Sequence, residues 1–184
     1  LTIDHVMTCY QMYADRIEPF WVSLPIHLRN AVSVFETHWV CWEPESKPAW
    51  VREAPDMAIV DPDYFPFFRP GMEFEEFVPE FGEWYSQGVP TACFVGIRTD
   101  ESLNRWRTIA SVHKTMYEAR QYTTLVRPNL YNVYPVYDWK TADLWVYQGR
   151  NLTLPSNHLY DLMYKAGLTI HQMRICQPYG DDQR

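Results

Sequence analysis

An uninterrupted apolar run, PTACFVGI at residues 90–97, most constrains the fold of this chain of 184 residues. A strand that is apolar at every position is typical of a strand covered on both faces, as in parallel α/β sheets. A predicted helix over residues 101–118 follows the run, and YNVYPVY at 131–137 indicates another strand. This alternation favours an α/β fold with an open, mostly parallel sheet flanked by helices.

Proline sets a second constraint, because six prolines fall within residues 42–72. Proline at this density excludes long helices. Tryptophan and phenylalanine lie between the prolines, so we interpret the segment as an ordered insertion held by aromatic side chains rather than a flexible linker. The chain has no internal repeat, and its length suits one α/β domain over residues 1–184 that contains this insertion.

The remaining elements are predicted from apolar spacing and from proline and glycine positions. FWVSLPI at 20–26 predicts a short buried strand, and residues 27–37 predict a helix or an irregular turn. Pro79 is expected to begin a helix, because proline is favoured in the first helical turn. Further helices are predicted where apolar residues recur at helical spacing: 2–17, 73–87, 142–148 and 155–167.

Composition and charge exclude several classes of function. The formal net charge of -7 argues against an extended nucleic-acid surface, because phosphate backbones attract basic faces. No run of 18 apolar residues could cross a membrane, and the first residues lack the pattern of a signal peptide. The 4 cysteines are far apart with no C-x-x-C pair, which supports neither a zinc site nor an iron–sulfur cluster. We therefore expect a cytoplasmic protein.

The segment GIRTDESLNRWR at 96–107 places three arginines directly after the apolar run. Ligands of open α/β sheets bind beyond the carboxyl ends of the strands, and the strand at 90–97 delivers Arg98 to that edge. Gly96 allows a sharp turn or a close approach of the backbone to a ligand. The planar guanidinium of Arg98 suits phosphate or sulfate oxygens.

Five further residues of this segment are candidates for the same site. Asp100, Glu101 and Ser102 lie where the helix begins, and the amide groups of a helix N-terminus favour anions. Arg105 and Arg107 lie in its first turns and could converge with Arg98 on a phosphate. The alternative is that Asp100 and Glu101 pair with Arg105 and Arg107 at helical spacing, and the sequence alone leaves both interpretations open.

Two motifs, GIRTDESLNRWRTI and YPVYDWKTADLWVY, give the chain a resemblance to the phosphoadenosine phosphosulfate reductase family. That family belongs to the adenine nucleotide alpha-hydrolase, or ATP-pyrophosphatase, superfamily. The chain most resembles a subgroup with a domain of unknown function after the reductase-like core, which includes the immunoglobulin-binding regulator A proteins. The ending MRICQPYGDDQR and the middle WEPESKPAWVREAP are similar to that subgroup.

The resemblance implies an adenine nucleotide as ligand, either ATP or phosphoadenosine phosphosulfate, with Mg²⁺ as a compatible ion. Gly96, Ile97 and Arg98 match the family motif that contacts the phosphate or sulfate end of the nucleotide. Asp138 and Trp139 match a DW pair that precedes a short helix beside the site, although Asp138 could instead only cap the turn. The implied chemistry is attack at the α-phosphorus or sulfur transfer, with no catalytic residue identified.

Two departures from the family pattern bear on catalysis. The glycine-rich pyrophosphate loop that defines the superfamily is absent, and only 7 glycines occur, so we expect a fold that is incomplete at its N-terminus. The reductases carry a catalytic cysteine in a C-terminal tail, and no such tail occurs here. Cys176 lies near Arg174, but a cysteine beside Ile175 is more typical of a packed thiol than of a nucleophile.

These departures favour an alternative from another class of function. A regulatory or interaction protein could keep the fold and lose turnover, acting in transcriptional regulation. The resemblance then implies a ParB-like protein as the partner, and the aromatic segment 42–72 would supply the contact surface.

Overall fold

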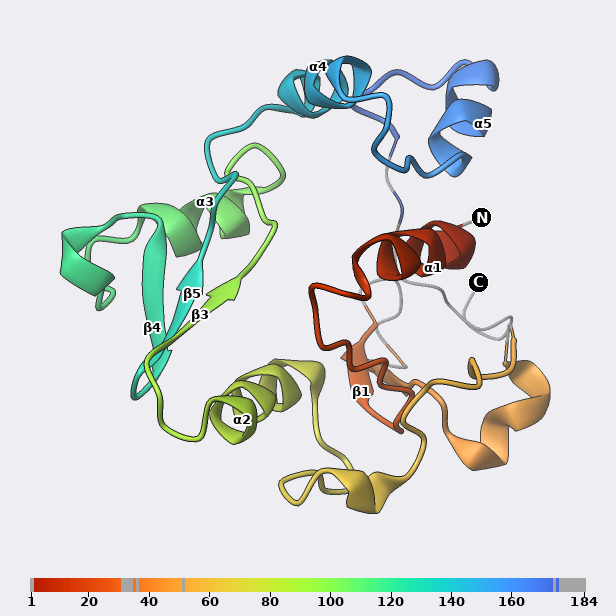
Figure 1. The fold of residues 1–184 in the computed structure, drawn as a ribbon, viewed down its shortest axis with the longest axis vertical. Coiled ribbons are helices and arrows are strands. Elements are labelled where there is room, and N and C mark those ends of the chain that lie inside the picture. The colour runs from red at the N-terminus through yellow and green to blue at the C-terminus, as the bar shows by residue number, and fades with distance from the viewer. Residues whose placement is uncertain (1, 31–34, 36, 51, 174, 176–184) are drawn as a thin grey trace. The chain divides into compact units, whose positions relative to one another are not determined.

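The structure, a computed structural model, describes residues 2–30, 35, 37–50, 52–173 and 175. These residues divide into two compact units. Among the described residues, the first unit comprises residues 2–19 and 92–175, and the second comprises residues 20–91. Figure 1 shows their helices and strands. All residues proposed above for nucleotide binding belong to the first unit.

A three-stranded sheet consists of β3 (Thr91–Phe94), β4 (Thr123–Arg127) and β5 (Leu130–Val133), in the order β3-β5-β4 (Figure 1). β4 and β5 form an antiparallel hairpin. The chain after β3 runs parallel to the chain after β5, because two hydrogen bonds advance in the same direction along both. Val95 N donates to Val133 O (2.9 Å), and Thr99 N donates to Tyr137 O (2.9 Å).

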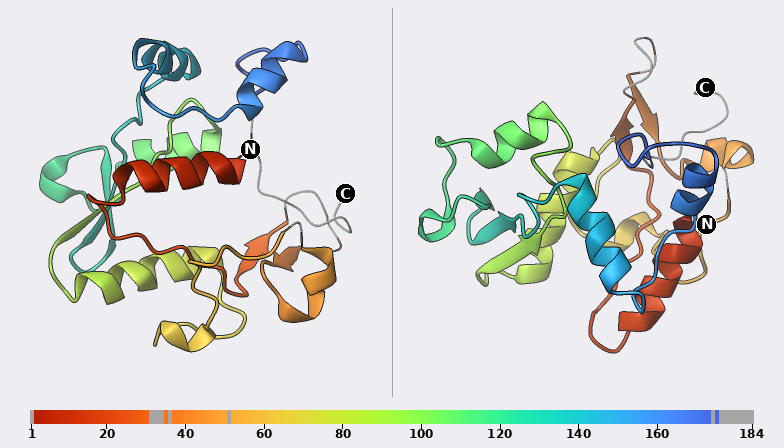
Figure 2. Two further views of the ribbon diagram at one scale, coloured as in Figure 1. Left: turned by 45° about the vertical axis from the view of Figure 1, so that its right-hand side comes forward. Right: turned by 90° about the horizontal axis from the view of Figure 1, so that it is seen from above.

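The helices of the first unit are α1 (Thr2–Tyr13), α3 (Leu103–Ala110), α4 (Thr141–Arg150) and α5 (Leu159–Lys165). α3 follows β3 and lies beside the sheet in Figures 1 and 2. Its inner face buries Ile109, as expected for an amphipathic helix on a sheet. α4 follows β5, so each of the two parallel segments leads into a helix.

The prediction that the first strand is covered on both faces is wrong. Side chains along β3 alternate between half-buried and exposed, and Phe94 is 71% exposed. Among the described residues β3 is an edge strand that pairs only with β5, which explains this exposure. The described sheet is mixed, with one parallel and one antiparallel pairing, and the open, mostly parallel sheet stays a prediction.

The second unit combines a small hairpin with short helices. The strands β1 (His27–Arg29) and β2 (His38–Val40) are antiparallel, and α2 spans Phe74–Ser86. The only helices that the described residues of segment 42–72 form are the short 3₁₀ helices η1 (Pro44–Ala49) and η2 (Pro62–Tyr64), as its prolines predict. The buried core is formed by Leu24, Ile26, Phe65, Met72 and Phe77.

Two predicted elements of the second unit differ from the structure. Segment 20–26 forms only an isolated bridge between Val22 and Ile59, and the strand begins at His27. The helix predicted to begin at Pro79 begins at Phe74, because the side chain of Glu76 accepts a hydrogen bond from Glu73 N (3.0 Å). Residues 31–34 and 36 of the predicted helix or turn at 27–37 lie outside the described residues.

Candidate functional site

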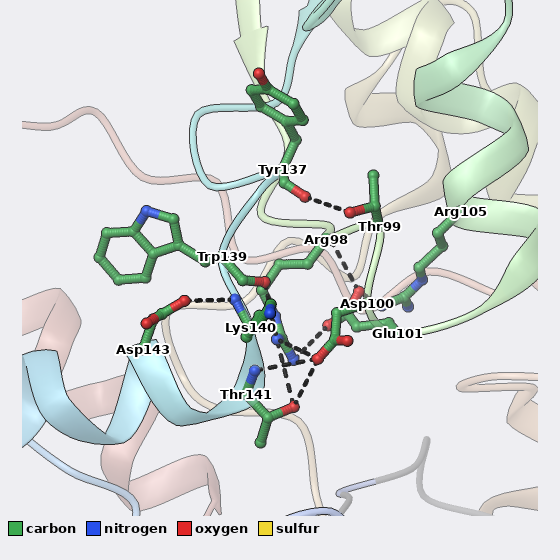
Figure 3. Close-up of polar contacts among 10 residues, drawn as sticks. All are labelled: Arg98, Thr99, Asp100, Glu101, Arg105, Tyr137, Trp139, Lys140, Thr141 and Asp143. Atoms are coloured by element: carbon green, nitrogen blue, oxygen red, sulfur yellow. Dashed lines mark hydrogen bonds and ion pairs between the residues drawn. The ribbon is translucent and has the colours of Figure 1, made fainter.

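Two loops meet beyond the carboxyl ends of β3 and β5, and they form the candidate site (Figure 3). The first loop, residues 95–102, connects β3 to α3, and the second, residues 134–140, connects β5 to α4. Thr99 holds them together, because its backbone N and its Oγ1 both donate hydrogen bonds of 2.9 Å to Tyr137 O. Two helices therefore begin where the loops meet, at the edge of the sheet where ligands bind in α/β folds.

Arg98 lies at the centre of this site and is only 8% exposed. Its Nη1 donates to Trp139 O (3.3 Å) and to Thr141 Oγ1 (3.5 Å). The same guanidinium forms ion pairs with Asp100 (Nη1 to Oδ2, 3.7 Å) and Glu101 (Nη2 to Oε1, 3.5 Å). The buried cation therefore joins the first loop to the start of α4, about forty residues further along the chain.

Asp100 places a carboxylate at the N-terminus of α4 (Figure 3). Its Oδ2 accepts hydrogen bonds from Thr141 N (3.2 Å) and Thr141 Oγ1 (3.3 Å). The backbone hydrogen bond from Thr141 lowers the pKa of Asp100, with further contributions from the Thr141 hydroxyl and the charges of Arg98 and His171. The helix N-terminus thus already binds an anion, supplied by the chain itself.

Glu101 binds both arginines of the site. Its Oε2 accepts from Arg98 N (3.1 Å) and pairs with the guanidinium of Arg105 one helical turn away. Partial burial alone would raise the pKa of Glu101, but the hydrogen bonds from Arg98 and Arg105 and the charges of both arginines outweigh it. The pKa of Glu101 is therefore lowered, and its ionised form is stabilised by folding.

This lowered pKa predicts a loss of stability in acid. A carboxyl group whose pKa is lower in the folded chain stabilises it above the unfolded pKa, near 4.5, and that contribution is lost as the pH falls through the folded value. We expect Glu101→Gln to reduce the acid-dependent fall in melting temperature, measured by circular dichroism from neutral pH downward. An unchanged pH dependence in the variant would contradict this role of Glu101.

The structure brings together some of the predicted site residues and separates others. Ser102 is the N-cap of α3, and its Oγ accepts from Arg105 N (3.2 Å). Trp139 contributes its carbonyl group to Arg98, while its ring contacts Tyr147 at 5.3 Å between centroids. Arg105 pairs with Glu101, so one of the helical pairs in the alternative interpretation is present.

Three predicted residues make no contact with Arg98. Gly96 is exposed, and a Cβ atom there would meet nothing within 4 Å, so no close packing requires glycine. Arg107 and Asp138 are exposed, and among the described residues no side-chain hydrogen bond or ion pair involves either of them. The converging group therefore consists of Arg98, Asp100, Glu101, Arg105 and the start of α4.

Sequence reasoning missed the part that the start of α4 plays in this site. Thr141 lies directly before the predicted helix 142–148, and it contacts both Arg98 and Asp100. The N-cap is Lys140, whose backbone N donates to Asp143 Oδ2 (2.8 Å). The acidic residue three positions after the N-cap is the sequence signal that could have located this helix start.

Within the described ranges, no three His, Cys, Asp or Glu side chains are grouped so that they could hold a metal ion. No helix in the described part of the chain is long and apolar enough to cross a membrane.

Comparison with known proteins finds an uncharacterized relative. The chain is 46% identical, over 186 aligned residues, to the uncharacterized protein YbdN of Escherichia coli (strain K12). The alignment covers 100% of this chain and 45% of YbdN, so the chain spans less than half the length of that relative. No family model matches the chain, and no solved structure matches it.

Proposed function

We propose that the chain binds an adenine nucleotide, ATP or phosphoadenosine phosphosulfate, by its phosphate or sulfate end. The proposal follows the sequence resemblance to the phosphoadenosine phosphosulfate reductase family and implies pyrophosphatase or sulfur-transfer chemistry in the cytoplasm. The observation that carries it is the buried guanidinium of Arg98 beside the first turn of α4, beyond the carboxyl ends of β3 and β5. This position combines a fixed cation with a helix N-terminus.

The arrangement can bind an oxyanion without large changes in the fold. Arg98 is held from the loop side by Glu101, whose Oε2 also binds Arg98 N, so the guanidinium stays in place when another partner leaves. The amide and hydroxyl of Thr141 lie on the other side and point to one carboxylate oxygen of Asp100. A phosphate or sulfate oxygen could replace that oxygen and accept the same hydrogen bonds.

Replacing Arg98 with lysine tests this proposal. Lysine keeps the positive charge but loses the planar pair of donors, so we expect Arg98→Lys to bind phosphoadenosine phosphosulfate at least about tenfold more weakly, a loss of about 1.4 kcal/mol. Isothermal titration calorimetry of the folded chain measures this affinity, and ATP is titrated in parallel. Arg150→Lys is the matched control, because Arg150 is exposed at the far end of α4.

Equal affinities for the parent chain and Arg98→Lys would contradict the proposed role, as would the absence of binding to the parent chain. The second result would favour the regulatory alternative, in which the chain keeps the fold without turnover. The observation that favours this alternative is that two carboxylates of the chain itself pair with the Arg98 guanidinium. That alternative predicts retained binding to a ParB-like partner and loss of this binding after changes in segment 42–72.

A further inference from the structure

We propose that Asp100 is an internal competitor of the ligand, occupying the oxyanion position at the start of α4 until a phosphate or sulfate group displaces it. This inference rests on the proposed function and adds a regulatory contact to the same site. Two neighbouring side chains then have opposite effects on affinity: Arg98 promotes ligand binding, and Asp100 opposes it. The competing group is part of the chain, so its effect on affinity does not depend on a separate inhibitor.

The contacts of Asp100 are those expected of a bound anion. One oxygen, Oδ2, accepts from both the amide and the hydroxyl of Thr141 and lies 3.7 Å from Arg98 Nη1. A phosphate oxygen at the same point would find the same donors and the same cation. Both anions cannot occupy the position, and their mutual repulsion would raise the free energy of any complex in which Asp100 stays there.

Asp100 is also the carboxylate of the site that is better placed to move. Its side chain is 42% exposed and, within the described part of the chain, accepts hydrogen bonds from Thr141 alone. The Glu101 side chain is 25% exposed and is tied to Arg98 N, to the Arg98 guanidinium and to Arg105. Displacement of Asp100 into solvent therefore leaves Arg98 paired with Glu101 and the loop intact.

Replacing Asp100 with asparagine separates competition from a general change in charge. Asn keeps the size and an acceptor oxygen but removes the negative charge, so we expect Asp100→Asn to bind inorganic pyrophosphate at least about fivefold more tightly than the parent chain. The matched control is Asp143→Asn, which removes one negative charge from the same first turn of α4, where Asp143 contacts Lys140 N rather than Arg98. We expect the control to change the affinity less than twofold. Calorimetry measures the affinities, and the amide resonance of Thr141 reports binding at the site.

Each outcome of this experiment is decisive. Tighter binding by Asp100→Asn alone, with a shift of the Thr141 resonance, supports competition. Parent-like or weaker binding by Asp100→Asn overturns this inference, while Arg98-dependent binding by the parent chain would leave the proposed function standing. Equal tightening by Asp100→Asn and Asp143→Asn also overturns it, because net charge would then explain the effect. If no variant binds pyrophosphate, both proposals fail together, and melting temperatures establish that each variant is folded.

Discussion

Replacing Phe65 with alanine is expected to lower the free energy of unfolding by about 3–5 kcal/mol, the usual cost of removing a buried aromatic ring. Phe65 is 1% exposed and is the largest fully buried side chain of the described core. Its ring contacts those of Phe20, Phe77 and Trp84 at centroid distances of 6.5, 5.5 and 5.2 Å. Truncation leaves a cavity among rings that come from two separate segments, and rigid rings fill such a cavity poorly.

Urea unfolding followed by circular dichroism measures this loss. The control is Phe74→Ala, which removes the same ring from a position that is 49% exposed at the start of α2. We expect the control to cost about 1 kcal/mol or less, because surface substitutions away from special contacts have small effects. Similar losses for the two variants would contradict the assignment of Phe65 to the centre of the core.

Replacing Arg98 with methionine is expected to lower the free energy of unfolding by about 2–3 kcal/mol. Breaking a fully buried ion pair typically costs about 3–5 kcal/mol, and the partial exposure of the two carboxylate partners reduces that figure. Methionine fills much of the space of the arginine stem, so the loss reports the guanidinium contacts rather than a cavity. Without the guanidinium, Asp100 and Glu101 repel each other, and Trp139 O loses its donor.

Arg105→Met is the matched control for this substitution. Arg105 pairs with the same Glu101, but its side chain is largely in solvent, and exposed ion pairs contribute about 0–1 kcal/mol. The same urea titrations compare the two variants. If both lose equally little stability, Arg98 does not join the two loops as described, and its burial has no energetic consequence.

The sequence located Arg98 and three of its partners, Asp100, Glu101 and Trp139, but not Thr141. An apolar run followed directly by Arg98 identifies the end of a strand, and Ser102 marks the start of α3 as expected. The contact with Thr141 joins residues forty-three positions apart, and no local pattern encodes such a pairing. Gly96 and Arg107 were grouped with Arg98 because they are near it in sequence, whereas the strand-to-helix turn directs them elsewhere.

The elements that the sequence missed are those whose formation depends on tertiary packing. β4 and the strands of the β1–β2 hairpin are short, and their sequences show no strong alternation of apolar and polar residues. Pairing with a neighbouring strand, rather than a local sequence pattern, therefore determines that they form strands. Pro79 was expected to begin a helix, but reciprocal hydrogen bonds between Glu73 and Glu76 begin α2 earlier, which leaves the proline inside the second turn. Burial of Phe65 within a proline-rich segment likewise depends on rings from distant parts of the chain.

The most direct test of the account is a crystal structure of the chain grown with phosphoadenosine phosphosulfate. The account predicts a phosphate or sulfate oxygen within about 3 Å of an Arg98 guanidinium nitrogen and of Thr141 N, with the Asp100 carboxylate turned away from both. A nucleotide bound elsewhere, with Arg98 and Thr141 still holding Asp100, would contradict it.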